Sequence, residues 1–373
     1  MSDVIMHQWT CGRIPSDADE AIARIVHADD VRHVAIMPDI HAAGVLCNGV
    51  VIGTGQLVYP EAVGGDIGCG YAAVKLDAAA DALNARAAAE LLIRLRRVCP
   101  WNRLPRAGPW PPELDVATLS HPSLQSIARR DGAVQLGTLG RGNHFLELQA
   151  EVDGSLWLMV HSGSRAIGPA VRDHHLTQTT RGAGGLKRLD SDTDAGRAYL
   201  RDMEWARRYA AASRRAMIAS AATLVEEVLD CGTDWDTYVD IDHNHVQLEP
   251  HAAGELWVHR KGASPACAGQ RVLIPGSMGT ATFHAEGQGN SDSLCSSSHG
   301  AGRAWSRQEA RRRIGEKDVR RQLGSILFDP GVLDALREEA PAAYKDVRKV
   351  MEAQRDLVRI VRRMRTLLSH KGA

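Results

Sequence analysis

Aspartate, cysteine and histidine side chains recur beside glycines at the ends of apolar segments in this chain. Asp66 and Cys69 lie three residues apart within residues 64–70, where four of the seven residues are glycine. Because glycine lets the backbone turn tightly, both side chains can reach the same metal ion or two adjacent ions. A cysteine taken alone is more often a small buried hydrophobic residue, so the metal interpretation depends on further ligands.

Three histidines could supply those ligands. His144 begins an alternating segment, His161 ends an apolar one, and His243 follows the segment 240–242 at the end of a predicted strand. A single histidine in such a place is usually structural, but three of them together with the Asp/Cys turn favour a metal centre. Imidazole, thiolate and carboxylate ligands suit manganese, iron or zinc, and the sequence alone does not choose among them.

Two later segments could bind phosphate. Residues 273–280 (LIPGSMGT) end an apolar segment with small residues, whose backbone amides can bind an anion, although an ordinary turn has the same composition. In residues 296–307, His299 stands between small residues and is followed by Arg303 and Arg307. This spacing predicts a nucleophilic histidine beside a pair of phosphate-binding arginines.

These side chains belong to a chain of 373 residues with 44% hydrophobic and 24% charged residues, a composition typical of globular proteins. The formal net charge is zero, so a site for a polyanion must be a local patch. Residues 303–321 and 345–365 each contain eight Lys or Arg against three Asp or Glu. They predict a track for an RNA backbone, or alternatively two solvated helix faces.

The cysteines and the N-terminal residues predict a cytoplasmic location. The seven cysteines form no CxxC pair, which argues against a disulfide framework or a zinc knuckle. No signal peptide and no apolar run long enough to span a membrane are recognisable.

The hydrophobic pattern predicts a mixed α+β protein. We expect strands at 31–37, 49–58 and 71–76, a loop at 38–48, and a hairpin turning at Asp153-Gly154. Helices are expected at 78–98 and 194–230, and the six prolines of 99–122 predict a loop or lid. A β-rich region follows at about 238–284, and the last 70 residues are expected to be helical. We expect one α+β domain over residues 1–373, with flanking helices and a helical C-terminal part.

The order and the residues of seven segments resemble those of the RtcB family of RNA ligases, from about Met37 to Arg307. The segments are GGDIGCG, LGRGNHF, VHSGSR, HN, HRKGA, PGSMGT and SHGAGRxxSR. The resemblance implies the RtcB-like fold, in which central β-sheets pack against helices. It also implies a ligase that joins RNA 3′-phosphate or 2′,3′-cyclic phosphate ends to 5′-hydroxyl ends.

The resemblance also implies a role for each residue that matches a family motif. His299 is implied to be the nucleophile that carries GMP. Two Mn²⁺ ions are implied to be bound by Asp66, Cys69, His144, His161 and His243, with Cys69 bridging them. The guanylate is implied to be held by Asn143, Glu147, Asn244, Pro275, Gly276, Ser277, Met278, Gly279, Thr282, His299, Gly302 and Lys371. RNA phosphates are implied to contact Arg165, Arg260, Lys261, Arg303 and Arg307.

The implied reaction consumes GTP. GMP passes from the histidine to the RNA 3′-phosphate, giving an RNA-3′-pp-G intermediate, and the 5′-hydroxyl of the second RNA then displaces GMP. Paired divalent ions suit these steps because negative charge moves onto bridging oxygens. The implied substrates are broken RNAs, such as tRNA or rRNA fragments in splicing or repair, and an activating protein is a possible partner.

The sequence departs from the family pattern after residues 39–41. A Gly-Lys pair usually follows that Asp-x-His segment, whereas here the next residues are AAGVL. We therefore expect a cationic side chain near the RNA to be missing, and Arg141 could compensate for it. This departure and the proline- and tryptophan-rich segment 99–122 suggest a specialised repair paralogue.

Two other functions fit parts of the pattern. A metal-dependent RNA phosphoesterase or cyclic phosphodiesterase would use the same ions with water as the nucleophile. A catalytically silent RNA-binding module would use the metal only for structure. His299 separates the ligase from both, because neither a hydrolase nor a binding module needs a residue that accepts GMP.

Overall fold

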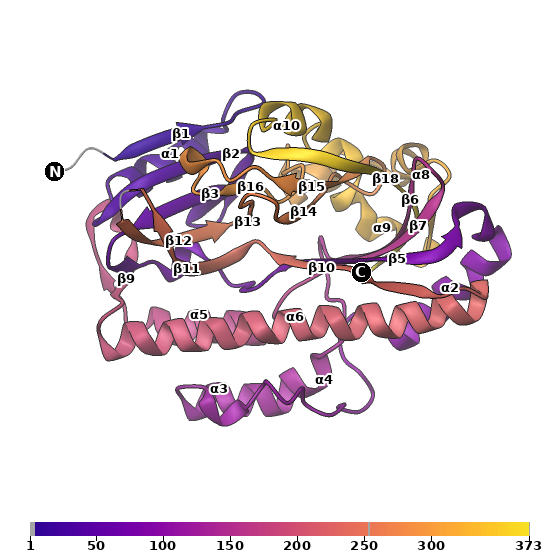
Figure 1. Cartoon of the computed structure of the whole chain (residues 1–373), viewed down its shortest axis with the longest axis horizontal. Helices are drawn as coiled ribbons and strands as arrows, with labels where there is room; N and C mark the ends of the chain where they lie inside the picture. Colours follow the sequence, from indigo (N-terminus) through magenta and orange to yellow (C-terminus); the bar gives the residue numbers. More distant parts are fainter. Residues whose placement is uncertain (1–3, 253, 373) are drawn as a thin grey trace.

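The computed structural model describes residues 4–252 and 254–372, and its central element is a large, mainly antiparallel sheet. This sheet lies between a smaller sheet and a layer of helices (Figure 1). Its strands, in spatial order, are β10 (Thr233–Asp242), β5 (Gly70–Ala79), β7 (Ser155–Ser162), β6 (Phe145–Glu151), β18 (Val358–Lys371), β15 (Ala281–Gly287) and β14 (Arg271–Pro275), and β17 (Leu327–Phe328) pairs in parallel with β18.

The smaller sheet has five strands and belongs largely to the first part of the chain. In spatial order they are β1 (Ile5–Gln8), β2 (Val31–Ala43), β3 (Leu46–Thr54), β12 (Gly254–Lys261) and β11 (Asn244–His251). Two minor sheets complete the β-structure: β13 (Ala263–Pro265) with β16 (Ser296–Ser298), and β4 (Leu57–Val58) with β9 (Lys187–Asp190) and β8 (Thr180–Arg181).

The central strands β5, β7 and β6 of the large sheet are buried on both faces, which explains their continuous apolar segments. Tyr71 and Met159 face the smaller sheet, where they share one hydrophobic cluster with Met37 and Val51. The alternate residues of the same strands, such as Val74, pack against the helices. This division follows from the two-residue period of a β-strand, and it places the core on either side of one sheet.

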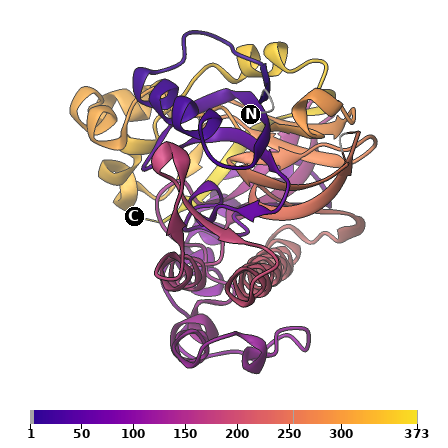
Figure 2. The same cartoon turned by 90° about the vertical axis from the view of Figure 1, so that its left-hand side faces the viewer.

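Helix α1 packs against β2 and β3 of the smaller sheet, whereas α2 and α6 cover the outer face of the large sheet. The long α6 runs beside α5 beneath the sheets, with α3 and α4 farther out, as the two views show (Figures 1 and 2). The helices are α1 (Ser16–Val26), α2 (Ala85–Val98), α3 (Pro122–Ile127), α4 (Ala133–Gln135), α5 (Ile167–Leu176), α6 (Asp194–Leu229), α7 (Arg307–Arg313), α8 (Glu316–Leu323), α9 (Leu333–Leu336) and α10 (Val347–Ala353).

Helix α6 begins and ends at clear local signals. The Thr193 side chain accepts a hydrogen bond from the Gly196 amide at the N-terminus, which satisfies a backbone donor that the first helical turn leaves unpaired. The helix ends at Asp230 in the left-handed conformation. Its buried face is unusual because it includes Asp202 and Arg214 among apolar residues, and both take part in ion pairs described below.

The α+β class, the hairpin, the long helix and the irregular segment 99–121 agree with the sequence-based expectations, whereas three local predictions were wrong. Residues 38–48 are not a loop, because β2 and β3 extend to a tight turn at Gly44 and Val45. The helix expected over 78–98 begins only at Ala85, after the end of β5 and a short 3-10 turn.

The third wrong prediction concerns the last residues, which were expected to be helical. Helices do occupy much of 307–353, but β18 is a 14-residue strand paired with both β6 and β15. The basic cluster at 345–365 is therefore divided, with four of its eight Lys and Arg residues on β18 and the others on α10 or in the segments beside it. Some of its arginines pair with acidic residues, as Arg359 does with Glu286 and Arg362 with Glu151.

Among the described residues, no helix is both long and apolar enough to cross a membrane.

Candidate active site

The five residues expected to bind metal come together where four strands of the large sheet end. Asp66 and Cys69 lie in the turn that leads into β5, His144 precedes β6, His161 lies in β7, and His243 links β10 to β11. Because β10, β5, β7 and β6 are neighbours in that order, these strand ends lie together at one end of the sheet.

Ligand atoms of these residues form two groups that share Cys69. One group contains Cys69, His161 and His243, the other Asp66, Cys69 and His144, and within each group the atoms lie within 4.8 Å of one another. The Cys69 Sγ is 3.2 Å from Nε2 of His161 and 3.5 Å from Nε2 of His144. A thiolate at this position can bridge two ions, so the donor set fits a two-metal centre.

Neighbouring backbone groups hold these ligands in place. Nδ1 of His161 lies 3.1 Å from the Asn143 carbonyl oxygen, which turns Nε2 toward Cys69, as hydrogen-bonded backbone carbonyls do for metal-binding histidines. Gly163 leaves room for Asp66, because a Cβ atom at that glycine would lie 2.1 Å from Oδ1 of the carboxylate.

Burial favours the neutral form of the ligands before a metal binds. It lowers the pKa of His161 and of His243 well below the ordinary value, so both imidazoles are neutral near pH 7 and can donate a lone pair. Burial, together with the negative charge of Asp66, raises the pKa of the Cys69 thiol. A divalent cation reverses this effect on a thiol, because it favours the thiolate.

His299 lies next to this centre and contacts a buried carboxylate. Its ring centroid is 4.7 Å from that of His243, and its Nδ1 is 2.6 Å from Oδ2 of Asp39. The His299 side chain is 12% exposed and that of Asp39 is completely buried. Since Asp39 faces Nδ1, the imidazole nitrogen left for nucleophilic chemistry is Nε2.

The position of Asp39 depends on an irregularity in β2. The pairing of β2 with β3 shifts register between Ile36 and His41, and Lys345 Nζ donates hydrogen bonds to the carbonyl oxygens of Pro38 and Ile40. Gly302 packs against this bulge with φ +70°, and a Cβ atom there would lie 2.1 Å from the Asp39 carbonyl oxygen. Sequence reasoning missed the role of Asp39, although a carboxylate within an apolar strand was a signal for it.

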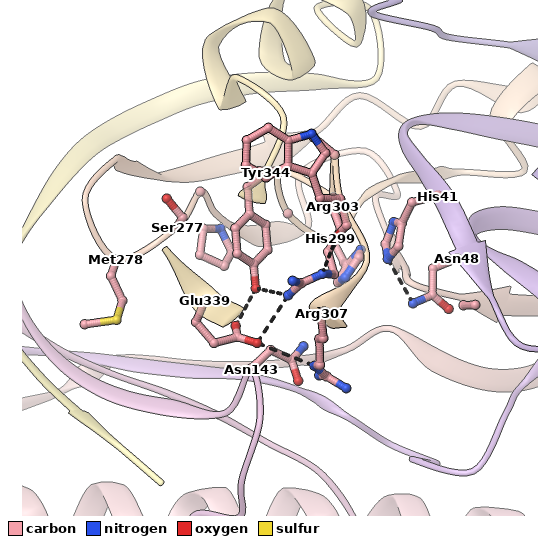
Figure 3. A pocket seen from close by; sticks show the side chains of 18 of the residues that line it. His41, Asn48, Asn143, Ser277, Met278, His299, Arg303, Arg307, Glu339 and Tyr344 are labelled. Carbon is pink, nitrogen blue, oxygen red and sulfur yellow. Dashed lines mark hydrogen bonds and ion pairs between the residues drawn. The ribbon is translucent and has the colours of Figure 1, made fainter. Parts of the chain in front are cut away.

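A cavity of about 750 Å³ opens beside His299 (Figure 3). Most residues expected to hold the guanylate line it: Asn143, Glu147, Pro275, Gly276, Ser277, Met278, Thr282, His299, Gly302 and Lys371. Asn244 and Gly279 are not among its lining residues. The Asn244 side chain instead bonds to the carbonyl oxygen of Asp66 and the amide of Gly262, so it braces the metal-binding turn.

A buried carboxylate that was not predicted, Glu339, organises the cations of the cavity (Figure 3). Its Oε1 is 3.2 Å from Nη1 of Arg303 and 3.6 Å from Nε of Arg307, and its Oε2 is 3.4 Å from Nζ of Lys371. Tyr344 Oη donates a hydrogen bond to the same Oε2 at 2.5 Å. Glu339 thus gathers three cationic side chains on one side of the cavity, where they can bind an anionic ligand.

The remaining residues expected to contact RNA differ in their surroundings. Arg165 donates to the Trp101 carbonyl oxygen and to Thr138 Oγ1. Lys261 donates to the Ala43 carbonyl oxygen and to Asn48 Oδ1.

The expectation for Arg260 was wrong. Its side chain is completely buried and ion-paired with Glu249, and it also donates to Ser296 Oγ and to the Leu294 carbonyl oxygen. Its motif neighbours a functional segment, but the alternation of β12 turns the arginine into the protein interior.

The departure from the family pattern at residues 42–46 has a visible consequence. Ala42 and Ala43 line the cavity, so no cationic side chain stands at these positions. Arg141, expected as a substitute, is exposed, bonds through Nε to Asn102 and is not among the lining residues. His41 lies beside these alanines, and burial lowers its pKa to about 4, so it is neutral near pH 7.

Comparisons with known proteins identify the family to which the chain belongs. A family model described as tRNA-splicing ligase RtcB matches residues 21–111 and 112–372. The RNA-splicing ligase RtcB of Escherichia coli K12 is 33% identical over 98% of this chain and 96% of its own length. RNA-splicing ligase RtcB1 of a second Escherichia coli strain is 34% identical with the same coverage. The tRNA-splicing ligase RtcB of Thermococcus kodakarensis is 33% identical over 66% of this chain and 61% of its own.

Proposed function

The chain belongs to the RtcB family, and from this premise we propose that it is a GTP- and Mn²⁺-dependent RNA ligase that works through a guanylylated histidine. The observation that carries the proposal is the position of His299, which lies between a buried carboxylate and a cluster of metal-binding side chains. A hydrolase that uses water as its nucleophile has no need of such a histidine.

Nε2 of His299 attacks the α-phosphorus of GTP, forms a P–N bond and releases pyrophosphate. The imidazole becomes positively charged in this step, and the Asp39 carboxylate 2.6 Å from Nδ1 stabilises that charge. The metal group of Cys69, His161 and His243 and that of Asp66, Cys69 and His144 would each hold one Mn²⁺. When bound, these ions supply positive charge that offsets the charge of the phosphates.

The next two steps use the same cavity. An oxygen of the RNA 3′-phosphate attacks the phosphorus of the histidine-bound GMP, the P–N bond breaks, and RNA-3′-pp-G forms. The 5′-hydroxyl of the second RNA then loses its proton and attacks the RNA phosphorus, which releases GMP and completes the phosphodiester. Arg303 and Arg307, which line the cavity, bind the phosphates because guanidinium groups match phosphate oxygens in geometry and charge.

Covalent labelling tests the proposal directly. Wild-type protein incubated with Mn²⁺ should take up label from [α-³²P]GTP but not from [γ-³²P]GTP, and the adduct should be labile to acid and stable to alkali. His299→Ala should remain unlabelled while retaining its metals. His33→Ala, a half-buried histidine outside the cavity, is the control and should label like wild type. Labelling of His299→Ala to the wild-type level would refute the assignment.

The choice of RNA ends gives a second test. RNA with a 3′-phosphate or 2′,3′-cyclic phosphate should be joined to RNA with a 5′-hydroxyl, whereas 3′-hydroxyl and 5′-phosphate ends should not be joined. Removal of the terminal phosphate without joining, by protein that never becomes labelled, would favour the alternative of a metal-dependent RNA phosphoesterase.

A further inference from the structure

A single arginine on α6 contacts all three segments that carry one group of metal ligands. Arg214 is 1% exposed, and its Nη1 donates to the carbonyl oxygens of Gly68 at 2.6 Å and Ser162 at 3.0 Å. Its Nε and Nη2 donate to the two carboxylate oxygens of Asp240 at 2.8 and 2.6 Å. Four of the five N–H groups of a guanidinium are used in these contacts.

The three acceptors lie close in sequence to three ligands. Gly68 immediately precedes Cys69, Ser162 immediately follows His161, and Asp240 lies three residues before His243. These segments belong to different strands and come together only in the folded protein. We propose that Arg214 is the positioning residue that holds the Cys69–His161–His243 group in a geometry that binds one of the two ions. This inference rests on the proposed metal centre but not on RNA joining.

An arginine suits this position better than any other residue. Its planar fork can donate to several acceptors at once, whereas a lysine ammonium is a compact charge that cannot reproduce the fork. Asp240 balances the charge of the guanidinium, which makes complete burial tolerable. The bonds to the Gly68 and Ser162 carbonyl oxygens direct Nη1 toward the backbone beside Cys69. The positive charge of the guanidinium there favours a metal-bound thiolate.

The second group of ligands has only one of these three supports, the bond to Gly68 beside the shared Cys69. Arg214 donates no hydrogen bond to Asp66 or His144, which contact each other at 3.0 Å between Oδ2 and Nε2. The role proposed for Arg214 therefore predicts an unequal effect. Loss of the guanidinium should weaken the ion held by Cys69, His161 and His243 much more than the ion held by Asp66, Cys69 and His144.

Titration of the metal-free full-length protein with Co²⁺ tests this inequality. Calorimetry gives the two affinities, and the sulfur-to-cobalt absorption band reports ligation by Cys69. In Arg214→Met we expect one affinity to fall about 10- to 100-fold, the usual cost of losing a residue that orients metal ligands, while the other changes less than about threefold. Arg214→Lys keeps the positive charge that balances Asp240, and its affinity at the same site should fall about tenfold.

Two further proteins separate a positioning role from general instability. Asp202→Asn changes another fully buried side chain of α6, which contacts His175, and should lower the unfolding temperature without weakening one affinity more than the other. Arg214→Met added to His243→Ala should change the affinity of the remaining site by less than about threefold. Arg214 and His243 act on the same site, so the effects of losing them are not additive.

Equal weakening of both sites in Arg214→Met and Arg214→Lys would overturn the positioning role. So would two affinities within about threefold of wild type. Wild-type protein that binds no Co²⁺ would overturn the proposed metal centre together with this role. Wild-type protein that binds two ions but is not labelled by GTP would overturn only the proposed function.

Discussion

Replacing Asp39 by asparagine tests whether the contact with His299 assists catalysis. The change keeps the shape of the side chain and removes its charge. In the structure, the Asp39 carboxylate is completely buried and lies 2.6 Å from Nδ1 of His299. Because the imidazole gains positive charge only as Nε2 attacks phosphorus, the carboxylate stabilises the transition state more than the ground state.

The size of the effect follows from the kind of contact that is lost. A contact at hydrogen-bonding distance contributes about 1.5–3 kcal/mol when one group is charged and about 1 kcal/mol when both are neutral. The difference of about 0.5–2 kcal/mol corresponds to a rate about 2- to 30-fold slower. Because Asp39 is buried, where charges interact more strongly than in water, we expect the upper end, about 30-fold.

The rate at which His299 is guanylylated is best measured under single-turnover conditions, with rapid acid-free quenching after mixing Mn²⁺-loaded protein with [α-³²P]GTP. Asp202→Asn is the matched control, because Asp202 is also fully buried and lies 2.7 Å from a histidine, His175. It should lose stability but become guanylylated at the wild-type rate. Asp39→Asn should show the slower rate at unchanged metal content.

A rate for Asp39→Asn within about threefold of wild type, with both metals bound, would refute the argument that Asp39 stabilises developing charge. The same slowing in Asp202→Asn would refute it as well, because the effect would then follow from loss of stability alone.

Three more outcomes are expected. Cys69→Ala should lose most bound Mn²⁺, measured by elemental analysis, because Cys69 belongs to both ligand groups. Replacement of the partly buried Cys231 by alanine should have no effect. Full occupancy in Cys69→Ala would contradict the bridging role. Glu339→Gln should lower the free energy of unfolding by roughly 3 kcal/mol in urea titrations, because it leaves partly buried Arg303 and buried Lys371 without their shared carboxylate. An unchanged midpoint would argue against this network. Burial lowers the pKa of Lys261 from 10.5 to about 8. Between these pH values the unfolded chain binds more protons than the folded one, so the stability should rise with pH by up to about 3 kcal/mol. Lys261→Met should lack this rise in thermal melts, and a pH profile parallel to that of wild type would contradict the argument.

The residues of the candidate metal cluster could be picked out from the sequence because each lies beside a local signal. His161 ends an apolar strand and Cys69 lies in a glycine-rich turn, and neither signal depends on distant parts of the chain. What the sequence could not supply was the strand order that makes these ends neighbours. Arg260 shows the limit of the same reasoning, because its motif is adjacent to the site while strand alternation directs its side chain inward.

The residues that were missed depend on contacts between distant segments. Glu339 lies on a short 3-10 turn with no recognisable motif, and it contacts Lys371, Arg303 and Tyr344 only after the C-terminal segment has folded. Strand β18 was mistaken for a helix because arginines interrupt the alternation of its first half. β15 pairs with its first half and β6 with its second half, which is the more buried, and this tertiary pairing outweighs local pattern.

The geometry of the site is fixed by a junction between the two main sheets. His243 is the single residue between β10 of the large sheet and β11 of the smaller one. Its amide donates to the Cys69 carbonyl oxygen, and its own carbonyl accepts from the Gly262 amide at the end of β12. A sliding of one sheet over the other would break these bonds together. Gly262 immediately precedes β13, which pairs with β16 just before His299, so the same backbone bonds link the proposed nucleophile to the segments of Cys69 and His243.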